Sequence, residues 1–341
     1  HLSGVTLNQN NLMAHNLIMT GLQKSMRIGG GAVMLQVFTT SGSSDMALLL
    51  TGCTLVANSV NASQCAADDS VIGGGAVFSY ATYAAMQVLA NQTRFVQNAC
   101  YASSVCLLPV ASSASQFEQL CNGGCGALLI GNTQRCTTGD NSFCFAIQNC
   151  ELEQNQVVFA TPAPNIGGGA LLSLTASITL LQNSTFVNNT AAPSLEGGAV
   201  FMQGPAQLEQ IRFVGNSGGV GGALSISSSC SIIDTHVIGN TGLVGGGIAV
   251  SGGSATLSDV TFLGNSVGAT GSGGGLLVSL SSDVVLTRFL FANDEAMVCE
   301  CIAVSVPHCI RLPFHPFPHA LFPCVLMRMC RCVDSVPVLL R

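Results

Sequence analysis

Apolar and polar positions along the chain recur in a fixed order, in which a glycine-rich box precedes an apolar run that ends on asparagine. A clear copy is VGGGIAVSGGSATLSDVTFLGN, residues 244–265. Short alternations such as Leu224-Ser-Ile226 are typical of strands, and glycine recurs within a few residues of every run. The pattern therefore predicts short strands bounded by turns, and not amphipathic helices with a period of 3.6 residues.

Two boxes alternate along the chain. Glycine boxes run from IGGGAV, ending at Val33, to SGGGL, ending at Leu276. The second box is an apolar residue followed three positions later by asparagine. Its asparagines are Asn58, Asn98, Asn155, Asn189, Asn216, Asn240 and Asn265, with Asn10 as a first copy and Asn293 as a last copy that has one extra residue. Four of the apolar residues are Phe95, Phe186, Phe213 and Phe262.

The lengths between the boxes separate a fixed unit from variable loops. The segment from glycine box to asparagine keeps the same length in the last four copies, whereas the segment from asparagine to the next glycine box varies. A constant segment indicates a structural unit, and a variable one indicates a surface loop, where changes in length cost little free energy. The full period suits one turn of a solenoid.

We therefore expect an all-β, single-stranded parallel β-helix of about nine coils stacked ~4.8 Å apart. Glycine lets the backbone turn sharply where a Cβ would clash. The phenylalanines are expected to point inward and to stack on their counterparts. The asparagines are expected to end the strand, to take the left-handed conformation and to pair with one another along the stack.

A finer column precedes the second box. Three residues before each apolar residue lie Asn183, Gln210, Asp234 and Asp259, which we expect to face outward. The positions two and five residues before it are small, branched or apolar, and we expect them to face inward. The residues directly after the glycines do not fit one register, because Val200 with Met202 and Leu172 with Leu174 give no simple alternation of inward and outward positions.

These boxes resemble the GGA[ILV] and FxxN repeats of the chlamydial polymorphic outer membrane protein family and of large right-handed β-helix surface proteins elsewhere, including algal ones. The closest copy is STFVNNTAAPSLEGGAVF, residues 184–201. The resemblance covers roughly residues 1–293 and is strongest after residue 166. It implies a right-handed β-helix on a cell surface, with adhesive or structural roles. The C-terminal membrane barrel of such bacterial proteins is not recognisable in this sequence.

Composition narrows the function classes. Charged residues make up 8% of the 341 residues, the net charge is −6, and Lys24 is the one lysine. Phosphate neutralisation needs clustered lysine or arginine, so we expect no nucleic-acid partner. We expect no membrane span, because no run of ~20 apolar residues is free of glycine, proline or polar breaks. The chain begins at His1 and has no signal segment, so we interpret it as a fragment or a processed product.

Cysteines and glycosylation triplets favour an extracellular or cell-surface location. Of the 16 cysteines, seven crowd a predicted insertion at about residues 99–165, and their irregular spacing favours disulfides over a zinc site, with free buried thiols as the alternative. They are Cys100, Cys106, Cys121, Cys125, Cys136, Cys144 and Cys150. The candidate glycosylation residues are Asn61, Asn91, Asn183 and Asn188.

The repeat domain is predicted to span residues 1–293 and an irregular tail residues 294–341. Five prolines in the tail exclude a regular helix or central strand. Three alternatives stay open for it: a segment that does not fold, a disulfide-bonded cap on the last coil, and a metal site. The candidate ligands of that metal site are Cys299, Cys301, His308, Cys309, Cys330 and Cys332.

Two functions remain open. The first is a non-catalytic scaffold, adhesin-like or structural, with surface glycans or other surface proteins as partners and with no cofactor or metal. The second is a carbohydrate-active β-helix enzyme of the pectate-lyase kind. Its catalytic candidates are Asp234 and Asp259, which occupy the same repeat position and are expected to be neighbours on successive coils. Such a pair can share a proton, which raises one pKa, or bind Ca²⁺.

Overall fold

The structure is a computed structural model and describes residues 1–15, 25–29, 31–38, 46–63, 69–82, 86–102, 124–132, 145–159, 167–175, 178–279, 282–296 and 302–304. Every regular element in these residues is a β-strand. Neighbouring strands pair in parallel throughout the described sheets. The predicted all-β, parallel character is therefore confirmed.

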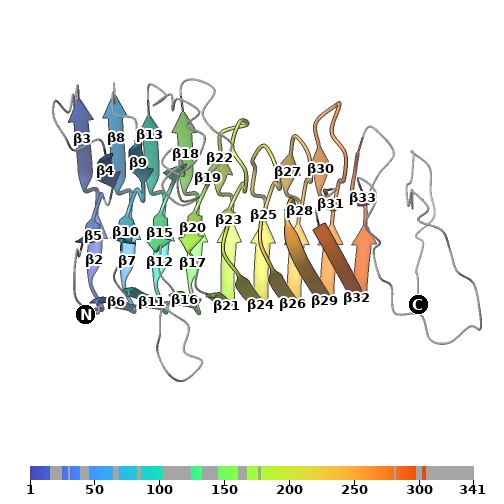
Figure 1. The fold of residues 1–341 in the computed structure, drawn as a ribbon, viewed down its shortest axis with the longest axis horizontal. Coiled ribbons are helices and arrows are strands. Elements are labelled where there is room, and N and C mark those ends of the chain that lie inside the picture. The colour runs from blue at the N-terminus through green and yellow to red at the C-terminus, as the bar shows by residue number, and fades with distance from the viewer. Residues whose placement is uncertain are drawn as a thin grey trace, which may run out of the picture.

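Two large sheets run along the molecule (Figure 1). The 13-stranded sheet contains β1 (Leu2–Ser3), β2 (Thr6–Asn8), β6 (Met46–Thr51), β7 (Thr54–Val56), β11 (Met86–Asn91), β12 (Arg94–Val96), β16 (Phe145–Gln148), β17 (Glu151–Glu153), β21 (Thr179–Val187), β24 (Ala206–Val214), β26 (Cys230–Ile238), β29 (Gly253–Leu263) and β32 (Ser282–Ala292). The nine-stranded sheet contains β5 (Val33–Phe38), β10 (Val77–Thr82), β15 (Leu128–Asn132), β20 (Leu171–Thr175), β23 (Val200–Met202), β25 (Leu224–Ile226), β28 (Ile248–Val250), β31 (Leu276–Val278) and β33 (Ile302–Val304).

The smaller sheets connect these two. The five-stranded sheet contains β3 (Asn11–His15), β8 (Ser59–Ser63), β13 (Ala99–Ala102), β18 (Gln156–Phe159) and β22 (Thr190–Ala191). Three two-stranded sheets pair β4 (Ser25–Gly29) with β9 (Asp69–Gly73), β14 (Gly124–Cys125) with β19 (Gly167–Gly168), and β27 (Thr241–Gly242) with β30 (Ser266–Val267).

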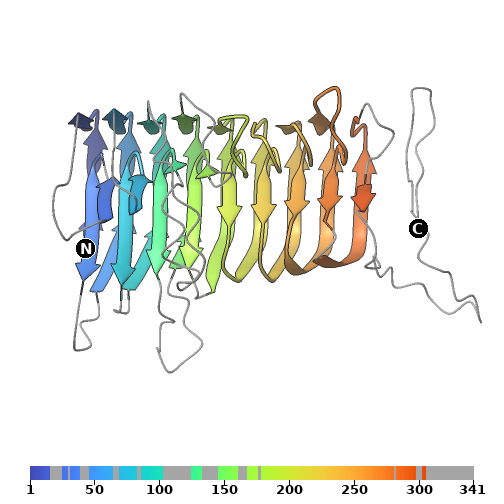
Figure 2. The same ribbon diagram turned by 45° about the horizontal axis from the view of Figure 1, so that its top comes forward.

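Strands recur in the same order along the chain, and each pairs with its equivalent in the preceding and following repeat. For example, β24 lies between β21 and β26, and Phe213 is aligned with Phe186 on one side and Val237 on the other. Figures 1 and 2 show these equivalent strands side by side along the long axis, from the N-terminal repeat in blue to the last repeat in orange. Successive repeats are thus in register along the whole stack.

The main core fills the space between the 13-stranded and nine-stranded sheets. Leu208 and Phe213 of β24 and Val200 and Met202 of β23 are buried in the same cluster. Along β24 buried side chains alternate with exposed ones, because successive side chains of a strand point to opposite faces, and the alternation shifts by one position at Gln210, where φ is 55°. The predicted inward and outward columns of this sheet follow from that alternation.

The nine-stranded sheet explains the ambiguous positions after the glycines, because both of its faces are buried in several repeats. Val200 packs in the main core, while its neighbour Phe201 belongs to a second buried cluster. That cluster consists of Phe78, Leu129, Leu172, Leu174 and Phe201. A strand buried on both faces shows no apolar–polar alternation in its sequence.

The predicted boundary at residue 293 does not coincide with the end of the stack. Strand β33 lies beyond it and pairs with β31, which continues the nine-stranded sheet by one strand. Residues 103–123, 133–144 and 160–166 of the predicted insertion, and residues 297–301 and 305–341 of the predicted tail, lie outside the described part of the chain.

Two columns of residues take positive φ, where the backbone turns between strand segments. The column before the asparagines contains Gly215, Gly239 and Gly264, but it also contains Ala57 with φ of 50°. The left-handed conformation costs a residue with a Cβ roughly 1–2 kcal/mol relative to glycine. Ala57 therefore holds strain that glycine at the same position avoids.

We expect Ala57→Gly to stabilise the chain by about 1 kcal/mol, because glycine takes this conformation without the Cβ clash. Denaturant unfolding measures the change. Ala90→Gly is the matched control: Ala90 is buried in strand β11, so the same substitution there should destabilise by roughly 1 kcal/mol. Equal effects at both positions would contradict the strained geometry at Ala57.

Candidate functional site

The asparagines predicted from the second box form one continuous ladder where the chain leaves the 13-stranded sheet. All members from Asn58 to Asn265 are fully buried. The asparagine ladder consists of Asn10, Asn58, Asn98, Asn155, Asn189, Asn216, Asn240 and Asn265, and it ends at Asp294. The structure therefore brings together all the asparagines expected to pair except Asn293.

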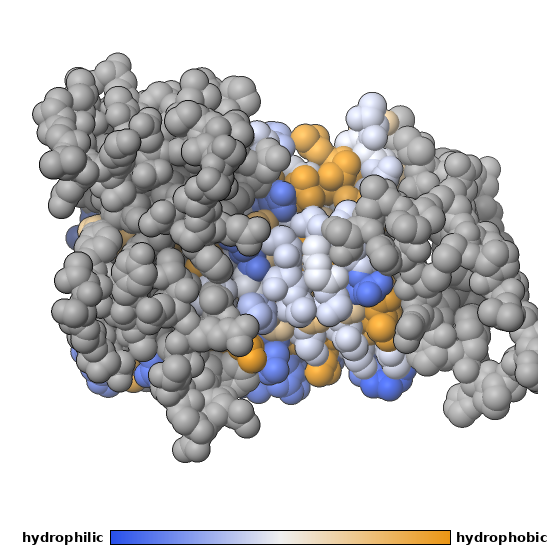
Figure 3. Space-filling model, viewed as in Figure 1, coloured by the Kyte–Doolittle hydropathy of each residue, from blue (hydrophilic) through white to orange (hydrophobic). Residues whose placement is uncertain are grey.

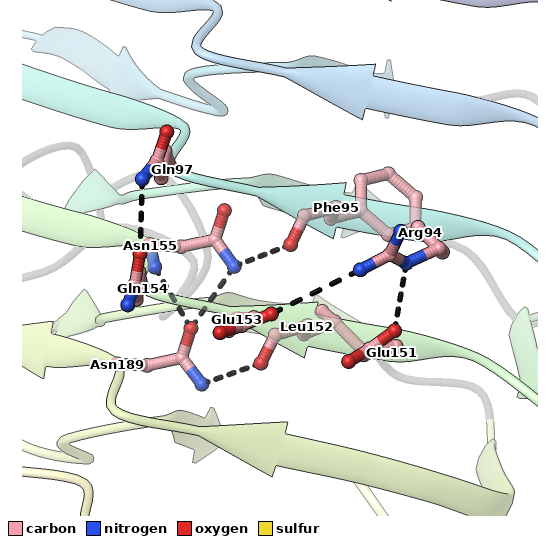
Figure 4. A network of polar contacts seen from close by, with 9 residues as sticks. All are labelled: Arg94, Phe95, Gln97, Glu151, Leu152, Glu153, Gln154, Asn155 and Asn189. Atoms are coloured by element: carbon pink, nitrogen blue, oxygen red, sulfur yellow. Dashed lines mark hydrogen bonds and ion pairs between the residues drawn. The ribbon is translucent and has the colours of Figure 1, made fainter.

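Each ladder amide from Asn58 to Asn265 makes the same four hydrogen bonds. Asn155 Oδ1 accepts from the main-chain N–H of Asn98 at 3.0 Å and from Asn98 Nδ2 at 2.9 Å. Asn155 Nδ2 donates to the carbonyl of Phe95 at 2.9 Å and to Asn189 Oδ1 at 2.9 Å (Figure 4). Both amide hydrogens and the oxygen are thus satisfied inside the protein, which removes the cost of burying a polar side chain.

The prediction that these asparagines take the left-handed conformation is wrong by one position along the chain. The positive φ belongs to the residue before each ladder asparagine, such as Asn188 at 51° and Gly215 at 64°. That turn directs the following asparagine inward, so the ladder residue is free to bond across repeats. Asparagine is required here for its amide and not for its tolerance of the left-handed region.

Asn293 is not the last ladder member, contrary to the prediction. Phe291 is aligned with Phe262, so the position equivalent to Asn265 is Asp294. Asn293 is exposed and has φ of 56°, as expected of the residue before a ladder position. The main-chain N–H and Nδ2 of Asn265 donate to Asp294 Oδ1 at 2.8 and 2.7 Å.

The phenylalanine column lies beside the ladder in the core, and Phe95, Phe186, Phe213 and Phe262 are all fully buried. Phe186 and Phe213 stack with ring centroids 5.1 Å apart. Phe262 stacks on Phe291 at 4.4 Å with nearly parallel rings. The aromatic contacts along the stack therefore reinforce the register that the ladder sets.

A third inward column was only partly anticipated from the sequence. It contains small polar side chains that bond to the main-chain carbonyl two residues earlier. Thr93 Oγ1 donates to Asn91 at 3.0 Å, Ser184 Oγ to Gln182 at 2.8 Å, and Thr235 Oγ1 to Ile233 at 3.0 Å. These bonds stabilise the backbone where the residue in between takes positive φ. Small hydroxyl residues recurring two positions before the phenylalanine were the available signal.

The catalytic candidates occupy equivalent positions, since Thr235 and Val260, which follow them, are aligned. Asp259, however, is engaged by Arg288 on the next strand. Arg288 donates from Nε to Asp259 Oδ1 and from a terminal nitrogen to Asp259 Oδ2, both at 2.6 Å. These bonds hold the pKa of Asp259 below its ordinary value and keep its carboxylate paired with Arg288.

The other outward side chains form short polar networks. Arg94 contacts Glu151 at 2.7 Å and Glu153 at 4.0 Å, and Gln97 Nε2 donates to Gln154 Oε1 at 3.0 Å (Figure 4). All five side chains belong to neighbouring repeats. Because these pairs lie at the surface, each contributes little to stability.

The glycosylation candidates lie on the outside to different extents. Asn183 and Asn188 are exposed, and Asn61 and Asn91 are half-buried. Asn183 Nδ2, the atom to which a glycan would be attached, donates to Asn149 Oδ1 at 2.7 Å. Asn91 Oδ1 accepts from Asn149 Nδ2 at 2.8 Å.

The expectation of disulfides is wrong for Cys100 and Cys150, which are free and buried, as are Cys53 and Cys230. Burial raises the pKa of Cys100 and Cys230 to about 12 and that of Cys150 to about 11. These thiols therefore stay protonated and behave as small apolar core residues. Cys106, Cys121, Cys136 and Cys144 lie outside the described residues, as does the side chain of Cys125.

Within the described part of the chain, no group of three or more histidine, cysteine or acidic side chains is placed to hold a metal ion. The candidate ligands Cys299, Cys301, His308, Cys309, Cys330 and Cys332 all lie outside it. Among the described residues, no helix is long and apolar enough to cross a membrane.

Comparison with known proteins gave no match to a family model, to a curated protein or to a solved structure.

Replacing one ladder amide tests the ladder. Asn216→Ala removes the acceptor for Asn189 and the donors to Phe186 and Asn240, leaving buried polar groups without their partner. We expect a loss of about 3 kcal/mol in the free energy of unfolding, measured with denaturant. Gln207→Ala, at an exposed position of the same repeat, should change stability by less than ~0.5 kcal/mol. A loss of that small size for Asn216→Ala would refute the ladder.

The ion pair between Arg288 and Asp259 predicts how the pKa of Asp259 responds to mutation. In the unmodified chain the pKa of Asp259 should lie below its ordinary value, and Arg288→Gln should raise it to that value, because the guanidinium no longer stabilises the carboxylate. Side-chain carboxyl chemical shifts followed by NMR across acidic pH report this pKa. Arg212→Gln on the same face serves as control. A pKa above the ordinary value in the unmodified chain would instead support proton sharing with Asp234.

Proposed function

We propose that the chain is a right-handed, single-stranded parallel β-helix that serves as a non-catalytic scaffold outside the cell or at its surface. The observation that carries this proposal is the unbroken register of equivalent strands and ladder residues from Asn10 to Asp294. A stack held this way is stiff along its axis. With nine repeats at ~4.8 Å per repeat, the stack would span about 40 Å.

The filled interior favours a mechanical or spacing role over a role in ligand binding. Between the two large sheets it is filled by apolar side chains such as Leu208, Phe213 and Ile232, and by the ladder amides. Filling of this kind resists compression and transmits force between repeats. The interior is thus used for stability, and the outward surface is left for contacts with partners.

The outward face of the 13-stranded sheet supplies such a surface. Gln148 Nε2 donates to Gln182 Oε1 at 2.8 Å, and Gln182 Nε2 donates to Glu209 Oε2 at 3.1 Å, so a row of side chains follows the long axis. On the face seen in Figure 3, the coloured surface between the grey residues contains both hydrophilic and hydrophobic side chains. Rows of amides and carboxylates suit hydrogen bonding to glycans or to other surface proteins, and these are the partners that we propose.

The resemblance of the GGA[ILV] and FxxN boxes to surface-protein repeats and the exposed Asn183 and Asn188 support the proposed location. In this role Asp259 is a surface residue paired with Arg288 and not a catalytic acid.

Removal of whole repeats tests the scaffold. Ladder residues Asn216, Asn240 and Asn265 are 24 and 25 residues apart, so deleting residues 217–265 joins Asn216 to Ser266 and removes two repeats. Because Ser217, Thr241 and Ser266 occupy the same position, we expect a folded chain that is shorter by about 10 Å. Small-angle X-ray scattering and circular dichroism measure length and strand content.

The matched control deletes residues 217–252, which ends within a repeat and places outward residues at inward positions. It should lose its strand signal, because such a change of register buries polar side chains. Survival of both deletions, or of neither, would contradict the repeat architecture. Cleavage of a cell-wall polysaccharide by the purified chain, abolished by Asp234→Asn, would contradict the non-catalytic role.

A further inference from the structure

The ladder ends on a carboxyl group where every earlier position has an amide. Asp294 is only 8% exposed and occupies the inward position equivalent to Asn265. Its Oδ1 accepts from the main chain and the side chain of Asn265, as each ladder Oδ1 does from the preceding repeat. Asp294 is therefore a ladder member and not a surface acid.

The other terminal atom of the ladder side chain, Nδ2, makes an equivalent hydrogen bond in successive repeats. Nδ2 donates to the carbonyl at the phenylalanine position of the preceding repeat: from Asn216 to Phe186 at 3.0 Å, and from Asn240 to Phe213 at 3.1 Å. In the eighth repeat Asn265 Nδ2 donates to Val237 at 2.8 Å. By the same register, Oδ2 of Asp294 takes the place of Nδ2. The carbonyl of Phe262 takes the place of the carbonyl that accepts from Nδ2 in the earlier repeats.

An oxygen at that place donates only when it carries a proton. Oδ2 is buried, and a Cβ on Gly275 would lie 3.1 Å from it, so the surroundings are close-packed. A neutral carboxylic acid reproduces the asparagine pattern, because one oxygen accepts and the other donates. A carboxylate has two acceptors and would present a charge to the dipole of a carbonyl oxygen.

The electrostatics agree with this geometry. Burial is the main cause that raises the pKa of Asp294 to about 6, and the hydrogen bonds from Asn265 and at the main chain of Ala292 lower it in part. No charged side chain is among the causes. The described charged residues of the adjoining segments are not buried: Asp259, Asp283, Arg288 and Glu295.

We propose that Asp294 is a proton-dependent latch on the ninth repeat. With a proton on Oδ2, Asp294 donates to the carbonyl of Phe262 and holds β32 and the following turn on the stack as an asparagine would. When the proton is lost to solvent, that hydrogen bond is lost, a charge is buried, and the ninth repeat opens more easily. The attachment of the ninth repeat thus responds to pH.

The direction of the effect follows from linkage. The pKa of Asp294 is raised from 3.8 to about 6, so between these pH values the closed repeat holds a proton that the open repeat has lost. Rising pH through this window therefore favours opening, and the opening constant should increase roughly hundredfold in total. Above the window no further change from Asp294 is expected.

Hydrogen exchange of the full chain measures the opening. The reporters are the main-chain amides of Asn265, which donates to Asp294 Oδ1, and of Glu295, which donates to the carbonyl of Asn265 at 2.7 Å. Their protection factors, corrected for the intrinsic pH dependence of exchange, should fall roughly hundredfold between pH 4 and pH 7. In Asp294→Asn they should stay constant and, at pH 7, exceed those of the unmodified chain.

Two controls separate the latch from general pH effects. Asp234→Asn removes an exposed carboxyl group from the same sheet and should leave the pH profile unchanged, and the amide of Asn189 in the interior of the stack should keep constant protection. A flat profile for Asn265 and Glu295 in the unmodified chain would overturn the proposal, and this result does not depend on the folding of any variant. A profile retained in Asp294→Asn would also overturn it.

Discussion

The directional hydrogen bonding of buried asparagines is the constraint on which the rest of the structure depends. Each amide accepts from the preceding repeat and donates to the following one, as Asn155 does between Asn98 and Asn189. A shift of one residue in any repeat would turn the amide outward and leave two neighbours with unsatisfied buried groups. The ladder therefore sets the register that the aromatic and aliphatic columns then fill.

Much of this arrangement was predictable from the sequence, because strand periodicity and repeat spacing together assign each position to a face. Phe186, Phe213 and the ladder asparagines are inward, and Asp234 is outward, as the alternation indicates. The burial of Phe201 in the nine-stranded sheet was not predictable in this way. Both faces of the sheet are buried there, so the sequence shows no alternation of apolar and polar residues. The parallel strands of the large sheets could be predicted from the sequence. Which faces of these sheets are buried also depends on tertiary contacts, which the sequence pattern does not show.

The local errors have physical causes. The left-handed position carries glycine, asparagine, glutamine or alanine in different repeats, so residue type does not identify it, whereas the asparagine that follows it is constant. Asn293 has the side chain of a ladder residue, but the alignment of Phe291 with Phe262 places Asp294 at the ladder position. The cysteine count suggested disulfides, but Cys100 and Cys150 fill core positions where their thiols have no partner cysteine.

Surface chemistry and core chemistry serve different purposes in this chain. Inside, polar groups are amides and small hydroxyls that bond to the backbone, and Asp294 is the one acid among the buried residues of the described segments. Outside, charges pair across repeats, as Arg288 does with Asp259. That division suits the scaffold that we propose, and among the described residues it leaves one buried acid, at the last position of the ladder.

The most direct test of the ladder is the exchange rate of individual asparagine side-chain amides, measured by NMR. The Nδ2 hydrogens of Asn98, Asn155, Asn189, Asn216 and Asn240 should exchange orders of magnitude more slowly than those of the exposed Asn188, because each is buried and donates two hydrogen bonds. Ladder amides that exchange as fast as that of Asn188 would contradict the account.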